Sequence, residues 1–287
     1  MKIRYLGTAA AEGAPALFCT CDHCAYARKA GGKEIRSRAG SILDDRLKID
    51  FGPDSFMQMI QNHIDYTPLK SILVTHSHSD HFCASDIGYR KPGFANLPEN
   101  YPPVTIYGNA KVGEAIESHL SDLIQFQLVE PYQPFEVEGY TVTALDAVHC
   151  IDREGSSHEY PVTFRGNTYY RSERALIYLI EKDGKALLYG HDTDELDPRV
   201  FECLKGKKLD LVSLDCTNGA KITTYVGHMG IEKDLNMREK LLECGAADAH
   251  TIFVANHFSH NGLIPYEALE KAMPGFRISY DSMEIEF

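Results

Sequence analysis

A dense group of metal-ligating side chains occupies residues 75–81, THSHSDH, directly after the apolar residues 72–74. Three histidines and an aspartate fall within six positions, in a chain with only 13 histidines among 287 residues. In an extended backbone His76 and His78 point to the same side, so both imidazoles can reach one metal ion. The next bend turns Asp80 and His81 towards a second ion. We therefore predict that this segment binds metal and is not merely a solvated polar loop.

Three further candidate ligands, His149, Asp192 and His257, each follow an apolar run. A polar residue at the end of an apolar run is typical of a buried strand that opens into a loop, where α/β proteins place their sites. Together with the first group they could hold two ions about 3.5–4 Å apart, bridged by Asp192. Asp50 ends another apolar run and is either an acceptor that orients a ligand histidine or a strand-ending turn residue.

A second cluster, CTCDHC at residues 19–24, has C-x-C-x-x-C spacing. Thiolates at this density favour zinc, although redox cysteines are the alternative interpretation. His23 is a local candidate for the fourth ligand. His260 is the other candidate, because it lies three residues after His257 and would tie the N-terminal loop to the C-terminal segment. We expect the remaining cysteines to be buried apolar residues: Cys83, Cys150, Cys203, Cys216 and Cys244.

Strand and helix patterns alternate along the chain, so we predict one α/β domain over residues 1–287, an αββα sandwich of two mixed sheets flanked by helices. The predicted strands are residues 3–6, 41–43, 47–50, 71–75, 104–107, 140–145, 175–180, 186–189, 209–214 and 251–255. The predicted helices are residues 54–63, 110–121, 196–205, 230–243 and 265–273.

The composition of the chain limits which classes of partner we expect. The net charge of −12 disfavours a broad nucleic-acid surface, but it does not argue against a phosphate substrate, because bound cations can dominate the local field. No segment approaches the ~20 apolar residues that span a bilayer. Eight cysteines without a secretion signal suggest reduced thiols or metal ligation. We expect a cytoplasmic protein with a small-molecule substrate, without a membrane partner, and with a homodimer as a possible assembly.

The metal-ligating residues resemble a known superfamily. Residues 75–81, His149, Asp192 and His257, in this order, are similar to the metallo-β-lactamase fold hydrolases, and the resemblance extends essentially end to end. Residues 19–24, HFSH at 257–260 and YDSMEI at 280–285 resemble one branch of it. That branch contains the cyclic phosphate phosphodiesterases of the bacterial carbon–phosphorus lyase pathway, which act on a phosphoribosyl cyclic phosphate.

The resemblance implies roles for individual residues. It implies that the first metal ion is held by His76, His78 and His149. The second ion would be held by Asp80, His81 and His257, and Asp192 would bridge the two ions. It also implies a structural zinc ion held by Cys19, Cys21, Cys24 and His260. His228 occupies the place of a family histidine that contacts the scissile phosphate.

Two departures from the branch concern specificity. The stretch between His149 and Asp192 is longer than usual, and we predict that its insert, residues 150–174, is a lid or wall whose Arg171 and Arg174 bind substrate. A solvated loop or a dimer contact is the alternative for the insert. His191 stands where the family usually has a small residue.

The expected activity is that of a dinuclear metal-dependent hydrolase, a phosphodiesterase acting on a small cyclic phosphate or phosphodiester. A hydroxide held between two zinc or manganese ions would attack phosphorus, while Asp80 accepts or shuttles a proton and His228 stabilises the phosphate. The alternatives are a tRNA 3′-processing nuclease, a cofactor-biosynthesis member of the same zinc-knuckle branch with hydrolase or oxygenase-like chemistry, and a non-catalytic metal-binding protein. A tRNA nuclease would normally carry a basic, glycine-rich arm, which the sequence does not show.

Overall fold

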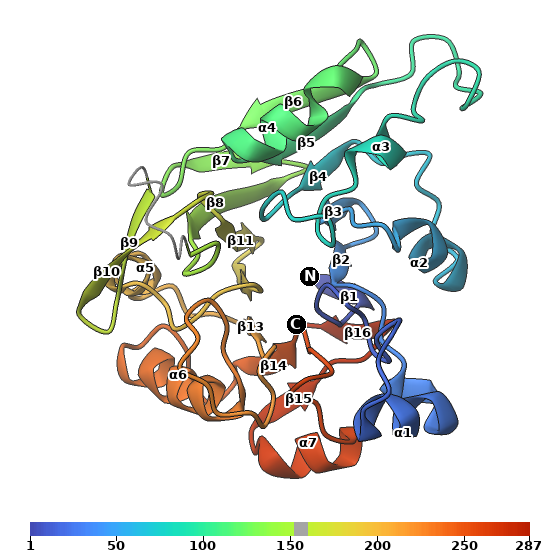
Figure 1. The fold of residues 1–287 in the computed structure, drawn as a ribbon. Helices are drawn as coiled ribbons and strands as arrows, with labels where there is room; N and C mark the ends of the chain where they lie inside the picture. Colours follow the sequence, from blue (N-terminus) through green and yellow to red (C-terminus); the bar gives the residue numbers. More distant parts are fainter. Residues whose placement is uncertain (152–159) are drawn as a thin grey trace.

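The computed structural model describes residues 1–151 and 160–287, which form two large mixed sheets (Figure 1). In spatial order the first sheet consists of β16 (Met283–Glu286), β1 (Lys2–Gly7), β2 (Gly40–Leu43), β3 (Leu47–Ile49), β4 (Ser71–Leu73), β5 (Val104–Gly108) and β6 (Ile124–Leu128). The second sheet consists of β15 (Phe276–Ile278), β14 (Ile252–Asn256), β13 (Leu211–Asp215), β12 (Lys185–Gly190), β11 (Leu176–Lys182), β8 (Tyr140–Asp146) and β7 (Pro134–Val137). The antiparallel pair β9 (Tyr160–Phe164) and β10 (Asn167–Arg171) stands apart from both sheets.

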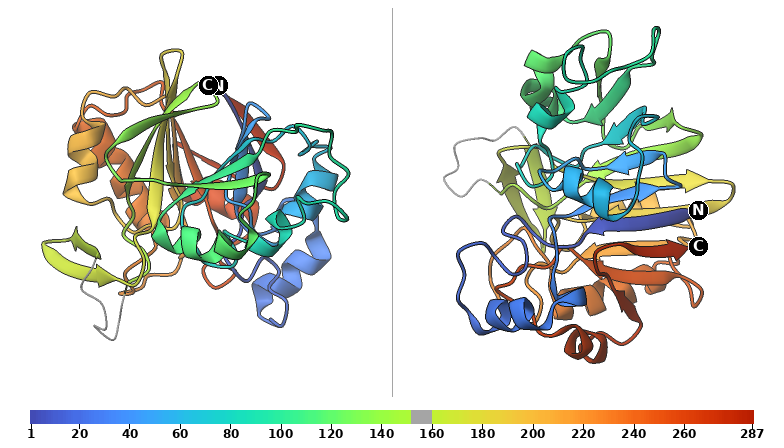
Figure 2. Two further views of the ribbon diagram at one scale, coloured as in Figure 1. Left: turned by 90° about the horizontal axis from the view of Figure 1, so that it is seen from above. Right: turned by 90° about the vertical axis from the view of Figure 1, so that its right-hand side faces the viewer.

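Helices lie on the outer sides of the two sheets, as the view from above shows (Figure 2). They are α1 (Asp22–Ala30), α2 (Ser55–Gln61), α3 (Ala84–Ile87), α4 (Ala110–Ile116), α5 (Pro198–Leu204), α6 (Ile231–Glu243) and α7 (Tyr266–Ala272), with short 3₁₀ turns η1 (Gly32–Glu34) and η2 (Glu117–His119). Among the described residues no helix is both long and apolar enough to cross a membrane.

Three apolar clusters hold these layers together. One lies between the sheets and joins residues of the first, such as Ile3 and Leu47, to residues of the second, such as Tyr178. A second packs α5, α6 and α7 on the outer face of the second sheet, and a third packs α3 and α4 on the outer face of the first. The predicted αββα sandwich of two mixed sheets is therefore confirmed.

Strand direction explains why the candidate ligands meet. Strands β12, β13 and β14 are parallel, and β8 runs the same way because β11 is antiparallel to both β8 and β12. Their carboxyl ends therefore share one edge of the second sheet. His149, Asp192 and His257 lie just beyond the ends of β8, β12 and β14. The segment with His76 follows β4 in the facing sheet.

Each predicted strand and helix is present, with boundary shifts of a few residues. The prediction for residues 110–121 was too long, because the α-helix ends at Ile116 and continues as the 3₁₀ turn η2. The sequence patterns also missed α1, in which Cys21 is the N-cap and its sulfur accepts a hydrogen bond from Cys24 N. Strands β6, β7 and β16 were missed because about half of their residues or more are exposed to solvent, which weakens the apolar signal.

Candidate metal centre and substrate cavity

The loop after β4 is held by Asp50, which follows the neighbouring strand β3. The backbone amide and hydroxyl of Thr75 donate to Asp50 Oδ1 at 2.8 and 2.9 Å, and His81 Nδ1 lies 2.7 Å from Asp50 Oδ2. The loop then bends, since the amides of His81 and Phe82 both donate to the carbonyl oxygen of His78. Asp50 thus orients His81 and leaves Nε2 of that ring facing the ligand cluster.

The carboxylate of Asp192 lies at the centre of the cluster. Its Oδ2 is 2.8 Å from His81 Nε2, 3.3 Å from His76 Nε2 and 3.7 Å from His149 Nε2. Its Oδ1 is 3.1 Å from His257 Nδ1. The side chains approach from the loops after β4, β8, β12 and β14. A carboxylate in this position can bridge two ions.

The remaining distances divide the ligands into two halves. His78 lies beside His149, with 3.4 Å between ring nitrogens. On the other side, His81 Nε2 lies 3.3 Å from Asp80 and 3.2 Å from His257 Nε2. The structure therefore brings together all seven residues expected from the sequence, and His76 lies between the two expected groups, with its ring centroid 4.4 Å from those of both His78 and His81. The ligand atoms of each group lie within 4.8 Å of one another.

The donor set fits divalent metal ions. Among the described residues, the buried atoms His76 Nε2 and Asp192 Oδ1 have no hydrogen-bond partner, which is costly unless another group satisfies them. Burial lowers the pKa of His76 well below its usual value and that of His149 to about 4, so both imidazoles keep a free lone pair. Neutral imidazoles and ionised carboxylates are the ligands that zinc and similar ions require.

The carboxylates make the cluster electron-rich. Burial opposes ionisation of Asp80, but the nearby charge and hydrogen bond of His81 hold its pKa at about 2. Burial likewise acts to lower the pKa of His81, yet Asp80, Asp192 and Asp50 raise it well above its usual value. The carboxylates therefore attract positive charge to this position, which a proton on His81 supplies in the metal-free protein and a bound cation would replace.

Two acceptors that the sequence analysis missed support the other histidines. Asp215, the last residue of β13, lies 2.9 Å from His228 Nδ1 and accepts from the Thr217 amide at 2.9 Å. Burial would lower the pKa of His228, but Asp215 raises it to about 9. Thr217 Oγ1 lies 2.8 Å from His257 Nδ1. Asp215 carries a signal like that of Asp192, a carboxylate at the end of a mainly apolar strand, and could have been found by it.

A cavity of about 410 Å³ opens over the cluster. The residues that line it include the buried Asp80 and Asp192, together with His228 and the exposed polar side chains of Lys221 and Asn261. This volume and lining suit a small polar molecule.

The expectation that Arg171 and Arg174 bind substrate is not supported by their positions. Neither lines this cavity in the described part of the chain. Arg171 is 1 % exposed, its guanidinium pairs with Asp146 at 2.9 Å, and it donates to the carbonyl oxygen of Ala147 at 2.8 Å. Arg174 pairs with Asp146 at 2.8 Å. The two arginines therefore stabilise the end of β8, just before His149, because a buried carboxylate there needs cationic partners.

Glu173 is a further supporting residue that the sequence did not reveal. It is buried, and its carboxylate accepts from the Ser77 amide at 2.7 Å, the Ser77 hydroxyl at 2.6 Å and Asn109 Nδ2 at 2.7 Å. Because Ser77 lies between His76 and His78, Glu173 fixes the backbone that carries both ligands. The end of the insert thus holds the metal loop. Residues 152–159 of the insert lie outside the described residues, and the lid or wall expected from residues 150–174 stays a prediction.

His191 faces the core and not the cavity. Its Nε2 lies 2.7 Å from Ser213 Oγ, Asn256 Nδ2 is 3.1 Å away, and its ring centroid is 3.9 Å from that of Tyr189. Burial lowers its pKa well below the usual value. This neutral, packed ring supports the strand end that presents Asp192.

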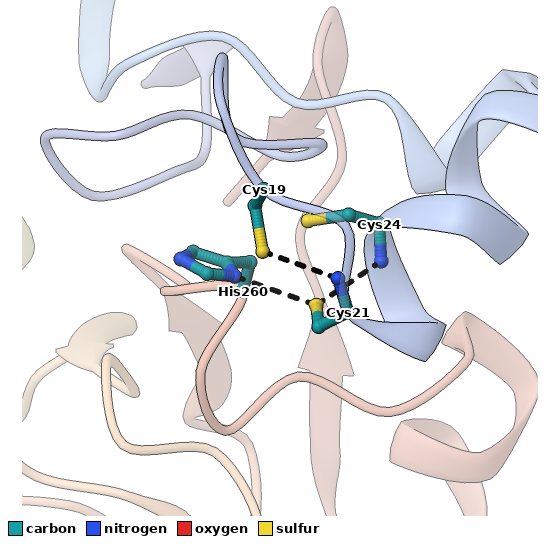
Figure 3. A group of neighbouring side chains, drawn as sticks. All are labelled: Cys19, Cys21, Cys24 and His260. Atoms are coloured by element: carbon teal, nitrogen blue, oxygen red, sulfur yellow. Dashed lines mark hydrogen bonds between the residues drawn. The ribbon is translucent and has the colours of Figure 1, made fainter.

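The cysteine cluster forms a separate site at the start of α1 (Figure 3). Cys21 Sγ lies 3.6 Å from His260 Nδ1, and the ligand atoms of Cys19, Cys21, Cys24 and His260 lie within 4.8 Å of one another. The hydrogen bond with His260, with smaller contributions from the neighbouring Cys24 and Cys19, lowers the pKa of Cys21 to about 6. Of the two candidates for the fourth ligand, the structure places His260 and not His23 in the group. The set fits a closed zinc site.

Comparisons with known proteins agree with this architecture. The model of the beta-lactamase superfamily domain matches residues 45–258. A ribonuclease Z from Listeria innocua is 31% identical over 133 residues, which cover 42% of each protein, so the match spans less than half of that relative.

Solved structures show the same fold over the whole chain. A diphosphatase from the PhnP family superposes with a TM-score of 0.72 at 20% identity, covering 100% of this chain and 97% of its own. Zinc-bound PqqB from Methylobacterium extorquens gives 0.74 at 17% identity with full coverage of both. The short form of human tRNase Z gives 0.63 at 15% identity, covering 100% and 99%. The chain therefore belongs to the beta-lactamase superfamily and has the metallo-β-lactamase fold of its metal-dependent hydrolases.

Proposed function

We propose that this protein is a dinuclear metal-dependent phosphodiesterase. The observation that carries the proposal is that five of the seven ligands and His228 line one cavity, while the other two ligands, His76 and His81, are fully buried. A phosphodiester hydrolase needs a polarised water and positive groups where negative charge develops on the phosphate oxygens. Two divalent ions held by these ligands would activate the water and neutralise that charge.

The chain's own residues supply orientation and proton handling. Asp215 engages Nδ1 of His228, which leaves Nε2 as the donor to a phosphate oxygen. Asp80 lines the cavity, so its carboxylate can accept a proton from the attacking water. Lys221 and Asn218 also line the cavity and can bind the part of the substrate beyond the scissile phosphate.

The size of the cavity favours a small cyclic phosphate or a simple phosphodiester. A second candidate is tRNA 3′ processing, which the 31% identity with a ribonuclease Z supports. The net charge of −12 argues against it, because a polyanionic partner is held largely by counterion release to basic surfaces.

An assay panel separates the candidates. Bis(p-nitrophenyl) phosphate, a ribose cyclic phosphate, a cyclic nucleotide and a tRNA precursor would each be tested with zinc and with manganese. We expect turnover of the small diesters and little cleavage of the tRNA precursor. Cleavage of the tRNA precursor alone would favour the nuclease, and inactivity on the whole panel would contradict the proposal.

Variants tie that activity to the site. His228→Ala should lower kcat about 100-fold or more, as expected for removal of one donor to the transition state. The matched control is His250→Ala, because His250 is exposed and belongs to none of the candidate metal groups among the described residues. Equal activity of both variants would exclude the proposed role of His228.

A further inference from the structure

Cys150 lies next to the first half of the metal cluster, although its sequence spacing gave no such indication. It follows His149 directly and is buried, and its sulfur lies 3.8 Å from His78 Nε2. The sulfur and one ring nitrogen each of His76, His78 and His149 all lie within 4.8 Å of one another.

The backbone of Cys150 is held in a conformation that an L-residue rarely adopts. Its φ is +54°, and its carbonyl oxygen accepts hydrogen bonds from the amide and hydroxyl of Ser172, at 2.9 and 3.2 Å. A non-glycine residue with positive φ is uncommon and persists where the surroundings fix it. The turn places the thiol on the side of His78, and Ser172 keeps it there.

The first half of the cluster also has unused capacity for a ligand. His76 Nε2 is fully buried and has no hydrogen-bond partner among the described residues. The Asp192 oxygen that lies 2.8 Å from His81 is 3.7 Å from His149. The bridging carboxylate therefore lies nearer to the second half, so an ion in the first half has room for a further protein donor besides the three imidazoles.

We propose that Cys150 is a ligand of the first metal ion, together with His76, His78 and His149. The sulfur binds as a thiolate, so the S–H proton is released to solvent as the metal–sulfur bond forms. A soft ligand in this half favours zinc or cobalt over manganese, which prefers oxygen ligands. This inference rests on metal binding at the cluster and not on the proposed phosphodiesterase activity.

Cobalt substitution tests the proposal without an activity measurement. Wild type, Cys150→Ser, Cys150→His and the control Cys203→Ser would be produced in zinc-free medium with Co²⁺, so that each site fills with cobalt as the protein folds, and compared by near-ultraviolet absorption and by cobalt content. Sulfur-to-cobalt charge transfer reports only cobalt–thiolate bonds. Three knuckle cysteines and Cys150 would give four such bonds, so both Cys150 variants should lose about a quarter of the band.

The control separates this effect from general damage. Cys203 lies in α5 and is absent from the candidate metal groups of the described residues, so Cys203→Ser should keep the full band. If Cys150→Ser loses the first metal ion altogether, only the absorption due to the Cys150–cobalt bond should disappear. The other ligands of that ion bind through nitrogen and oxygen and give no sulfur-to-cobalt charge transfer. Cys150→His provides a second variant that can still ligate if Cys150→Ser fails to fold. A band of wild-type intensity in a folded Cys150 variant would overturn the proposal.

Discussion

The cysteine cluster and the active-site cluster gather their ligands in different ways. The cysteine cluster takes three ligands from six consecutive residues and adds one distant histidine, His260. The active-site cluster takes its ligands from four loops at strand ends and buries nearly all of them, His78 being the exposed one. The first site is largely local and closed by thiolates, whereas the second depends on the assembled sheets and opens into a cavity. This difference predicts that the first site stabilises the fold and that the second performs chemistry.

The largest expected effect comes from removing the residue that joins both halves of the active-site cluster. Asp192→Ala should lose at least one ion per chain. Its activity should fall by more than roughly 100-fold, because changing a residue that only supports a metal ligand already costs up to that much. The cysteine cluster should keep its zinc. Metal analysis and the small-diester assay check this prediction, and an unchanged ion count would contradict the bridging role.

Removing a ligand of the cysteine cluster should have the opposite effect, a large loss of stability with little loss of activity. Cys21→Ser should lose the structural zinc and lower the free energy of unfolding by on the order of 4 kcal/mol, as loss of a structural metal does. Activity per folded molecule should change little. Denaturant unfolding and active-site titration check this, with Cys203→Ser as the control. A stable but inactive Cys21→Ser would place the cysteine cluster in catalysis.

The histidine that faces the cavity should make stability depend on pH. In metal-free protein the folded-state pKa of His228 is raised to about 9, above its usual 6.5, so the protonated ring stabilises the fold. That contribution is fully present below pH 6.5 and is lost as the pH rises towards 9, a change of about 3 kcal/mol at most. Unfolding of wild type and His228→Gln between pH 6 and 9.5, with the active-site ions removed and the cysteine cluster still holding its zinc, checks this. Parallel pH profiles would contradict it.

A smaller effect should follow from loosening the metal loop. Glu173→Gln weakens the charge-assisted hydrogen bonds to Ser77 and should lower metal affinity of the active-site cluster about 10- to 100-fold, with the cysteine cluster unaffected. The control is Glu267→Gln on the exposed face of α7. Metal-competition titrations measure both. Equal affinities in the two variants would show that Ser77 is positioned by other contacts.

The active-site ligands could be predicted from the sequence because they follow apolar runs. When so many histidines and aspartates lie at strand ends, they rarely lack a common function. The residues that support these ligands could not be predicted, because their roles depend on contacts between distant segments. Glu173 reaches Ser77 across 96 positions, and Arg171 turns inward to Asp146. An arginine in a long insert suggests an anion-binding surface, and only the fold shows that its partner is an internal carboxylate. Cys150 was assigned to the core for the same reason.

The most direct test of the central claim is the number and lability of the metal ions. Native mass spectrometry and elemental analysis would follow wild-type protein during stepwise chelation. We expect three ions per chain, two in the active-site cluster and one in the cysteine cluster. The two active-site ions should leave first, with loss of activity and little loss of stability. The ion of the cysteine cluster should leave only as the protein unfolds. One ion or fewer in folded, active protein, or loss of all ions in a single step, would contradict the account.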